Sequence, residues 1–345
     1  MDARTIRASA PLRISFVGGG TDFPHYYERH GGAVLAATID HAAHVSITPR
    51  EDLQVRIRSL DLGHLVRYHL EEGPVYDGVM DLPKAAIARF GTTTGMDVDI
   101  ASDAPPGSGL GGSSALVTAC VGALALLSER ELSREEVARL SYAIERDDLA
   151  IAGGWQDQYA AAFGGFNLLE FGATGVDVSP LDLPGEAART LRENLLLCYT
   201  GAVRTDLGLI KTQIRLYREG REETIVGMKE LHEMAYEMRD AVSSLEIDAL
   251  GRLLREAFES KKRMNPHIAE GTPIERLLHV AREAGAIGGK VCGAGGGGYL
   301  LLACRPERQA AVRAALEVHG GEFADFAFRD QGVEASDGRL TWRPS

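Results

Sequence analysis

The stretch PPGSGLGGSSALV at residues 105–117 combines two prolines with a glycine- and serine-rich loop and then turns apolar. A loop with so few side chains exposes backbone N–H groups, and at a helix N-terminus these groups meet the positive end of the helix dipole. A serine-capped turn would need fewer small residues, so the stretch predicts a phosphate site. We expect contacts from Pro106, Gly107, Ser108, Gly109, Leu110, Gly111, Gly112, Ser113 and Ser114.

Two glycine clusters, at residues 107–112 and 293–298, match the G-x-G-x-x-G pattern. A dinucleotide-binding fold needs a strand, the loop, a helix and then a second strand ending in an acidic residue. Two predicted helices follow the first cluster, and a strand follows the second. The segment 284–291, AGAIGGKV, has Ala284 and Val291 where a P-loop needs glycine and a hydroxyl. The sequence therefore favours neither a nicotinamide or flavin enzyme nor a P-loop NTPase.

The composition is that of an ordinary globular protein, with 345 residues, 45% of them hydrophobic and 25% charged. A net charge of −12 argues against a nucleic acid or an anionic membrane as partner. The four cysteines lack metal-site spacing and favour buried thiols in a reducing compartment. Without an apolar leader or a span-length apolar run, we expect a cytoplasmic protein with a small-molecule substrate. A homodimer is compatible with these totals.

The elements that must position the glycine loop are predicted from periodicity and capping. Alternating patterns predict strands in the first 100 residues, and DVDIAS at 97–102 predicts the strand that feeds the loop. Residues 113–127 are apolar nearly all round, as in a buried helix. SREE at 133–136 is a capping box. A helical stretch is expected from about 207 to 245, and a break in the pattern near 185–195 predicts domains of residues 1–190 and 191–345.

Three stretches together resemble the motifs of the GHMP small-molecule kinases, a superfamily that includes galactokinase, homoserine kinase and mevalonate kinase. They are APLRISFVGGGTDF (10–23), PPGSGLGGSSA (105–115) and KVCGAGGGG (290–298). Their order and spacing match, and the resemblance covers nearly the whole chain. It implies an α/β and α+β fold, with an N-terminal domain like ribosomal protein S5 domain 2 and a C-terminal ferredoxin-like domain. It also implies ATP, Mg²⁺ and phosphoryl transfer to a small acceptor.

Within the superfamily, GGGTD in the first motif and GAGGGG in the third most resemble D-glycero-D-manno-heptose 7-phosphate kinases. The resemblance implies phosphorylation of the anomeric hydroxyl of a sugar phosphate. One alternative is a kinase of an unphosphorylated sugar, like galactokinase or fucokinase, and another is a kinase of homoserine or an isoprenoid precursor. A third is a non-catalytic ATP and sugar sensor, which would have no reason to keep a catalytic base.

The resemblance also assigns chemistry to individual residues. Asp157, in GGWQDQYAA, matches the galactokinase stretch that carries the general base, and Arg13 matches the basic residue beside it. Glu145 precedes Asp157 by 12 positions, as the metal-binding glutamate does in galactokinases. With Ser113 or Ser114 it would hold Mg²⁺, which prefers hard oxygen ligands. The structural alternatives are a turn carboxylate for Asp157, a solvated carboxylate for Glu145 and a surface arginine for Arg13.

A further set of residues is expected to bind the acceptor. Asp22 would accept hydrogen bonds from sugar hydroxyls, with an Asx-capped turn as the alternative. The third motif would approach substrate or phosphates closely because its glycines lack Cβ, or it would form a bulged strand entrance. Cations are needed for a phosphate already on the sugar, with Lys261–Arg263 as reserves. The acceptor-binding candidates are Gly19, Gly20, Thr21, Asp22, Arg204, Lys211, Gly295 and Gly296.

Overall fold

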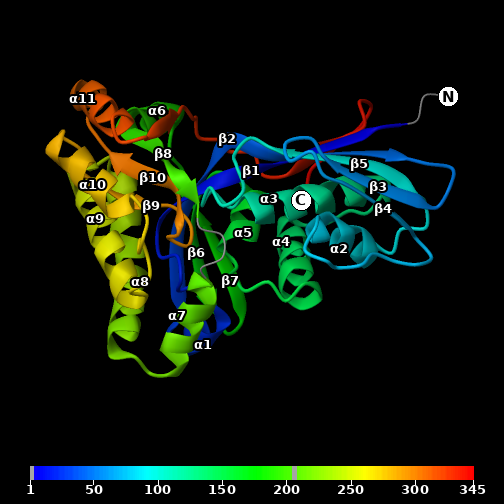
Figure 1. Ribbon diagram of the computed structural model, residues 1–345, viewed down its shortest axis with the longest axis horizontal. Helices are drawn as coiled ribbons and strands as arrows, with labels where there is room; N and C mark the ends of the chain where they lie inside the picture. The colour runs from blue at the N-terminus through cyan, green and yellow to red at the C-terminus, as the bar shows by residue number, and fades with distance from the viewer. Residues whose placement is uncertain (1–3, 204–207) are drawn as a thin grey trace.

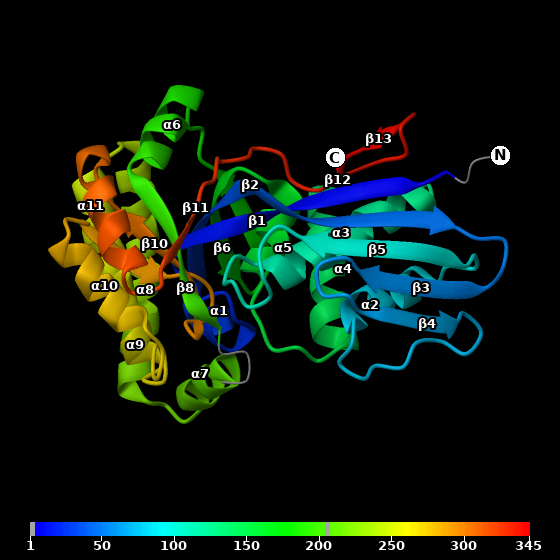
Figure 2. The ribbon, with the colours of Figure 1, turned by 45° about the horizontal axis from the view of Figure 1, so that its top comes forward.

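The larger of two sheets contains nine strands in the computed structural model, which describes residues 4–203 and 208–345. Its order is β13-β12-β1-β2-β5-β3-β4, with β6 pairing β2 and β7 pairing β6 (Figure 2). The pairs are antiparallel except for β3 with β5. The strands are β1 (Ile6–Val17), β2 (Gly32–Pro49), β3 (Gln54–Ser59), β4 (Leu65–His69), β5 (Met96–Ser102), β6 (Phe166–Gly172), β7 (Gly175–Pro180), β12 (Glu334–Ser336) and β13 (Thr341–Trp342).

Helices cover one face of this sheet (Figure 1). The central one, α3 (Gly112–Leu127), packs against β1 and β2 and is buried on nearly every side, as its apolar sequence predicts. The capping box at Ser133 and Glu136 is confirmed at the start of α4, where both reciprocal hydrogen bonds form. The other helices of this part are α1 (Pro24–His30), α2 (Asp81–Phe90), α4 (Arg134–Ala143), α5 (Gln156–Phe163) and a π-helical turn, Ile144–Asp148.

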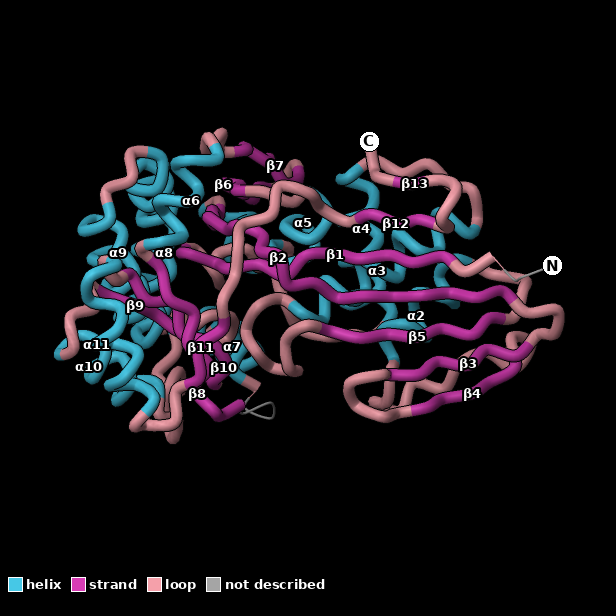
Figure 3. The backbone as a smooth tube through the Cα atoms, turned by 90° about the horizontal axis from the view of Figure 1, so that it is seen from above, coloured by secondary structure: helices cyan, strands magenta, loops and turns pink. Residues whose placement is uncertain are grey.

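The second sheet is antiparallel and has the order β11-β8-β10-β9. Along the chain the order of elements is a strand, a helical segment, two strands, a helix and a last strand. This is the split βαβ order of ferredoxin-like domains. Figure 3 shows its helices gathered at one end of the molecule. The elements are α6 (Gly185–Glu193), β8 (Leu195–Val203), α7 (Leu209–Arg218), α8 (Glu222–Ser243), α9 (Ile247–Met264), α10 (Ile274–Glu283), β9 (Gly288–Val291), β10 (Gly297–Ala303), α11 (Pro306–Glu317) and β11 (Glu322–Ala324).

Two features differ from the sequence expectations. The helical stretch expected from about 207 to 245 is two helices, because α7 ends before Gly220, which takes a left-handed φ of 71°. The end of the chain returns to the first sheet, where β12 pairs with β1. The predicted domains, residues 1–190 and 191–345, stay a prediction. The strands β12 and β13 belong to the first sheet although they come from the second of these ranges. Among the described residues, no helix is both long and apolar enough to cross a bilayer.

Candidate active site

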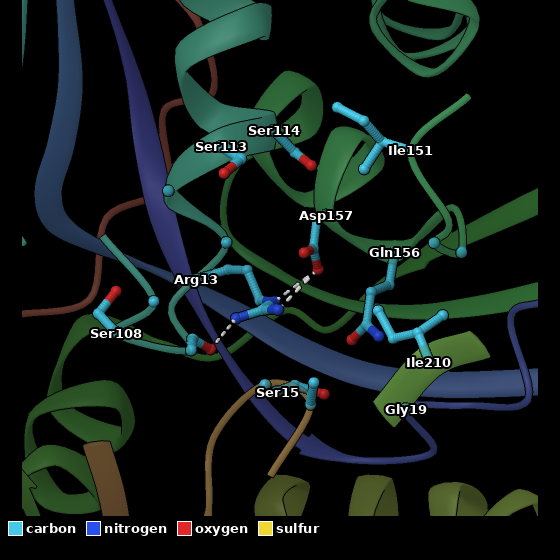
Figure 4. Close-up of a pocket in the computed structure, with 18 of the residues that line it drawn as sticks. Arg13, Ser15, Gly19, Ser108, Ser113, Ser114, Ile151, Gln156, Asp157 and Ile210 are labelled. Carbon is cyan, nitrogen blue, oxygen red and sulfur yellow. Dashed lines mark hydrogen bonds and ion pairs between the residues drawn. The ribbon is translucent and has the colours of Figure 1, made fainter. Parts of the chain in front are cut away.

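A cavity of about 400 Å³ lies where the two parts of the molecule meet. One wall comes from β1, the loop at residues 18–23 and the glycine loop that leads into α3. The other comes from α7, the end of α9 and the segment 290–294. Figure 4 shows Arg13 and Asp157 facing each other within it, with Ser113 and Ser114 at the start of α3. All three motifs that the sequence singles out therefore contribute to one cavity.

The glycine loop has the backbone expected of a phosphate cradle. Gly107, Gly109 and Gly111 take positive φ values of 74°, 80° and 78°, which side-chain-bearing residues adopt only at a cost. The first turn of α3 follows directly, so its unpaired N–H groups face the cavity. The predicted loop residues that line the cavity are Pro106, Gly107, Ser108, Gly109, Gly111, Gly112, Ser113 and Ser114. Leu110 is 1% exposed and anchors the loop in the core instead.

The third motif holds the glycine loop from behind. A Cβ on Gly109 would lie 2.7 Å from the Cys292 carbonyl oxygen, and one on Gly298 would lie 2.3 Å from the Ser108 carbonyl oxygen. The Tyr299 N–H donates to that same Ser108 oxygen at 3.0 Å. Gly293 lines the cavity. The predicted substrate contacts Gly295 and Gly296 do not line it, and a Cβ on Gly295 would lie 2.8 Å from the Ile268 side chain.

Gly109→Ala should therefore weaken ATP binding by about 5- to 150-fold, since the strained φ and the Cys292 contact together cost on the order of 1–3 kcal/mol. Calorimetric titration with ATP measures this loss. Gly112→Ala is the matched control, because its Cβ would meet atoms only at 3.9 Å and beyond and its N–H remains. Equal affinity for the two variants would contradict the interlocked loop.

Arg13 and Asp157 form an ion pair at the centre of the cavity. The Arg13 Nε and Nη2 atoms lie 2.8 and 2.7 Å from the Asp157 Oδ1 atom, and Nη1 donates to the Gly109 carbonyl at 2.7 Å. The Arg13 side chain is 4% exposed and that of Asp157 is 26% exposed. Asp157 lies in the first turn of α5, where the helix dipole favours its negative charge. No donor among the described residues reaches its Oδ2 atom, which leaves one oxygen available to a ligand.

Glu145 lies in the π-helical turn and is 2% exposed. Ser114 Oγ donates to its carboxylate at 2.9 Å, the Gln158 amide also donates to it, and Arg146 Nη2 lies 3.5 Å away. Burial is the main cause that raises the pKa of Glu145. A bound cation would stabilise the charged form of this buried carboxylate. The hard oxygens of Glu145 and Ser114 fit Mg²⁺, which takes few protein ligands and completes its shell with phosphates and water. Sequence reasoning missed Gln158.

The first motif divides into structural and cavity-facing residues. Gly19, Gly20 and Asp22 line the cavity. Thr21 does not, because it is fully buried and its hydroxyl donates to the Gly18 carbonyl at 2.8 Å. Asp22 is 1% exposed and accepts from the Gly20 N–H at 3.0 Å and the Gln156 N–H at 3.2 Å, while burial raises its pKa. It therefore ties the first motif to the start of α5.

The cations are arranged differently from the sequence expectation. Arg204 lies outside the described residues. Lys211 is exposed on α7 and does not line the cavity, whereas its neighbour Ile210 does. Lys261, expected only as a reserve, and Lys290, not considered, are both buried and line it. The position of Lys290 as the first residue of the third motif is the signal that could have identified it.

Comparison with known proteins agrees with this geometry. Residues 79–165 match the GHMP kinases N terminal domain, and residues 230–320 match the GHMP kinases C terminal domain. A D-glycero-alpha-D-manno-heptose 7-phosphate kinase of Campylobacter jejuni subsp. jejuni is 34% identical over 96% of this chain and 99% of its own length.

Two solved structures are similar over most of their length. A D-glycero-D-manno-heptose 1-phosphate kinase from Bacteriodes thetaiotaomicron has a TM-score of 0.79 and 30% identity, covering 96% of this chain and 98% of that one. The Lactococcus lactis galactokinase, solved with galactose, has a TM-score of 0.79 at 21% identity over 95% of this chain and 94% of that one, and so shares the fold. The chain belongs to the GHMP kinase family and is a small-molecule phosphotransferase.

Proposed function

We propose that this kinase transfers the γ-phosphoryl group of ATP to the anomeric hydroxyl of D-glycero-D-manno-heptose 7-phosphate, giving the 1,7-bisphosphate. The observation that carries the proposal is the Arg13–Asp157 pair, which bonds to the glycine loop through Gly109 and presents one free carboxylate oxygen to the cavity. The identity to the Campylobacter jejuni heptose 7-phosphate kinase, over nearly the full length of both chains, supports the choice of acceptor.

The proposed mechanism assigns each wall a task. The glycine loop and the start of α3 bind the ATP phosphates through backbone N–H groups. Glu145 and Ser114 would hold Mg²⁺, which neutralises charge on the phosphates. Asp157 accepts the hydroxyl proton as the anomeric oxygen bonds to the γ-phosphorus and the bond to the β–γ bridging oxygen breaks. Arg13 orients Asp157 through their ion pair and stabilises the transferred group.

The acceptor side of the cavity has hydrogen-bonding groups suited to a sugar. The Gln156 side chain lies beside Gly19, where a Cβ would be 3.2 Å from its amide nitrogen. Its amide oxygen is buried and has no partner among the described residues, so a sugar hydroxyl can donate to it. Asp22 lies on the same side. Met264 and Ile210 supply apolar surface for the carbon skeleton.

The test is an ADP-release assay with Mg·ATP and a panel of acceptors. The panel contains heptose 7-phosphate, heptose 1-phosphate, galactose, fucose, mannose, mevalonate and homoserine, with phosphorus NMR to locate the new phosphate. We expect the highest kcat/KM for heptose 7-phosphate, with the new phosphate at C1. Preference for an unphosphorylated sugar would overturn the heptose assignment and keep the mechanism. If the protein binds ATP but releases no ADP with any acceptor of the panel, the result would favour a non-catalytic sensor.

A further inference from the structure

Two lysines line the active-site cavity although both are almost completely buried. Lys261, on α9, is 7% exposed, and Lys290, on β9, is 4% exposed. Among the described residues no carboxylate lies within ion-pair distance of either one. Each makes one hydrogen bond to a backbone carbonyl: Lys261 to Gly293, and Lys290 to Ser15 at 2.7 Å. An ammonium group has three donors, so each lysine keeps two for a ligand.

Burying a cation without a carboxylate is unfavourable. Burial, followed by repulsion from the charge of Lys290, lowers the pKa of Lys261 to about 7. Burial is also the main cause that lowers the pKa of Lys290 to about 8. The other cations that line the cavity already have partners. Arg13 pairs with Asp157, and Arg146 donates to two backbone carbonyls beside Glu145. Among the described residues that line this cavity, the two lysines are therefore the cations left to compensate a ligand's negative charge.

Their contacts place both lysines beside the first motif. Lys290, on β9, donates to the carbonyl of Ser15, whose hydroxyl would lie 3.7 Å from a Cβ on Gly19. Met264, one helical turn after Lys261, lies against the first motif, where a Cβ on Gly20 would be 2.8 Å from its sulfur. The charge of Asp22 also acts on Lys261. Lys261 therefore lies on the acceptor side of the Arg13–Asp157 pair.

We propose that Lys261 and Lys290 form the subsite for the phosphate that the acceptor already carries, and that they select a sugar phosphate over the free sugar. This inference rests on the proposed function, because it assumes an acceptor with a phosphate away from the reacting hydroxyl. Charge-assisted hydrogen bonds to phosphate are the interaction expected of such lysines. Of the sequence candidates for this role, Lys211 does not line the cavity and Arg204 lies outside the described residues.

The first experiment measures selectivity in Lys261→Met and Lys290→Met, which keep the length of the side chain and remove its charge. We expect each to raise KM for heptose 7-phosphate by about 10- to 100-fold, while kcat/KM for unphosphorylated heptose and KM for ATP change less than about threefold. Lys262→Met is the matched control, since Lys262 on the same helix pairs with Glu275 at 2.8 Å. Equal losses on both acceptors, or no loss, would overturn the inference.

The second experiment does not depend on turnover. Protein saturated with Mg²⁺ and the non-hydrolysable analogue AMP-PNP is titrated with inorganic phosphate, and the rise in Tm is measured. We expect phosphate to raise the Tm of the wild type and of Lys262→Met. It should not raise the Tm of the double variant that carries Lys261→Met and Lys290→Met. A wild type that binds phosphate through the lysines but does not phosphorylate heptose 7-phosphate would overturn the proposed acceptor only. Absence of any phosphate effect in the wild type would overturn the subsite.

Discussion

Asp157→Asn should lower kcat by about 10³-fold, the middle of the range for loss of a positioned general base, and should change ATP affinity by less than about threefold. Asparagine keeps the shape of the side chain and can still accept from Arg13, which retains its bond to the Gly109 carbonyl. The glycine loop therefore keeps its geometry. What is lost is the carboxylate that takes the proton from the acceptor hydroxyl.

Single-turnover kinetics measure the chemical step, and calorimetry measures ATP binding. Asp147→Asn is the matched control, because Asp147 is an exposed carboxylate in the neighbouring segment. A decrease in kcat of less than about tenfold, with an unchanged KM, would show that Asp157 orients the hydroxyl and that proton transfer does not limit the reaction. Loss of ATP binding together with turnover would instead mean that the pair with Arg13 holds the loop in place.

The local elements of the fold could be predicted because their signals are short-range. The apolar run at 113–127 and the capping box at 133–136 each depend on neighbouring residues, and both are confirmed in α3 and α4. The return of the chain end to β1 has no such signal. It depends on close packing far along the chain, where Gly122 of α3 leaves room for Val333, whose side chain would lie 2.9 Å from a Cβ.

The candidate site shows the same division. The family resemblance identifies residues that do converge on the cavity: Arg13 within β1, Glu145 in the π-helical turn and Asp157 in the first turn of α5. Motif membership does not say which way a side chain faces, so Thr21 and Leu110 were included although both point into the core. The two lysines come from α9 and β9, which pack against each other, and the contact of Lys290 with Ser15 of β1 joins positions far apart in the sequence that no local pattern relates.

Glu145→Gln should abolish the increase in nucleotide affinity that Mg²⁺ provides and lower kcat/KM for Mg·ATP by about 10²-fold or more, as loss of a buried charged ligand would. The variant is nearly isosteric, and the Ser114 hydroxyl and Gln158 can still hydrogen-bond to it. Because burial disfavours the charged form of Glu145, the variant should fold with an unchanged or higher Tm.

Binding of ADP with and without Mg²⁺ separates a metal ligand from a structural carboxylate. The wild type should bind ADP more tightly with Mg²⁺, and the variant should bind it equally in both conditions. Glu135→Gln is the control, since Glu135 is an exposed carboxylate that pairs with Arg139 at 2.8 Å and does not line the cavity. A Mg²⁺ effect that survives in Glu145→Gln, with Tm lowered, would mean that Glu145 serves to hold Ser114 and Gln158 in position. The metal would then be held by other oxygens, and Asp157, which lines the same cavity and whose charge acts on Glu145, is a candidate.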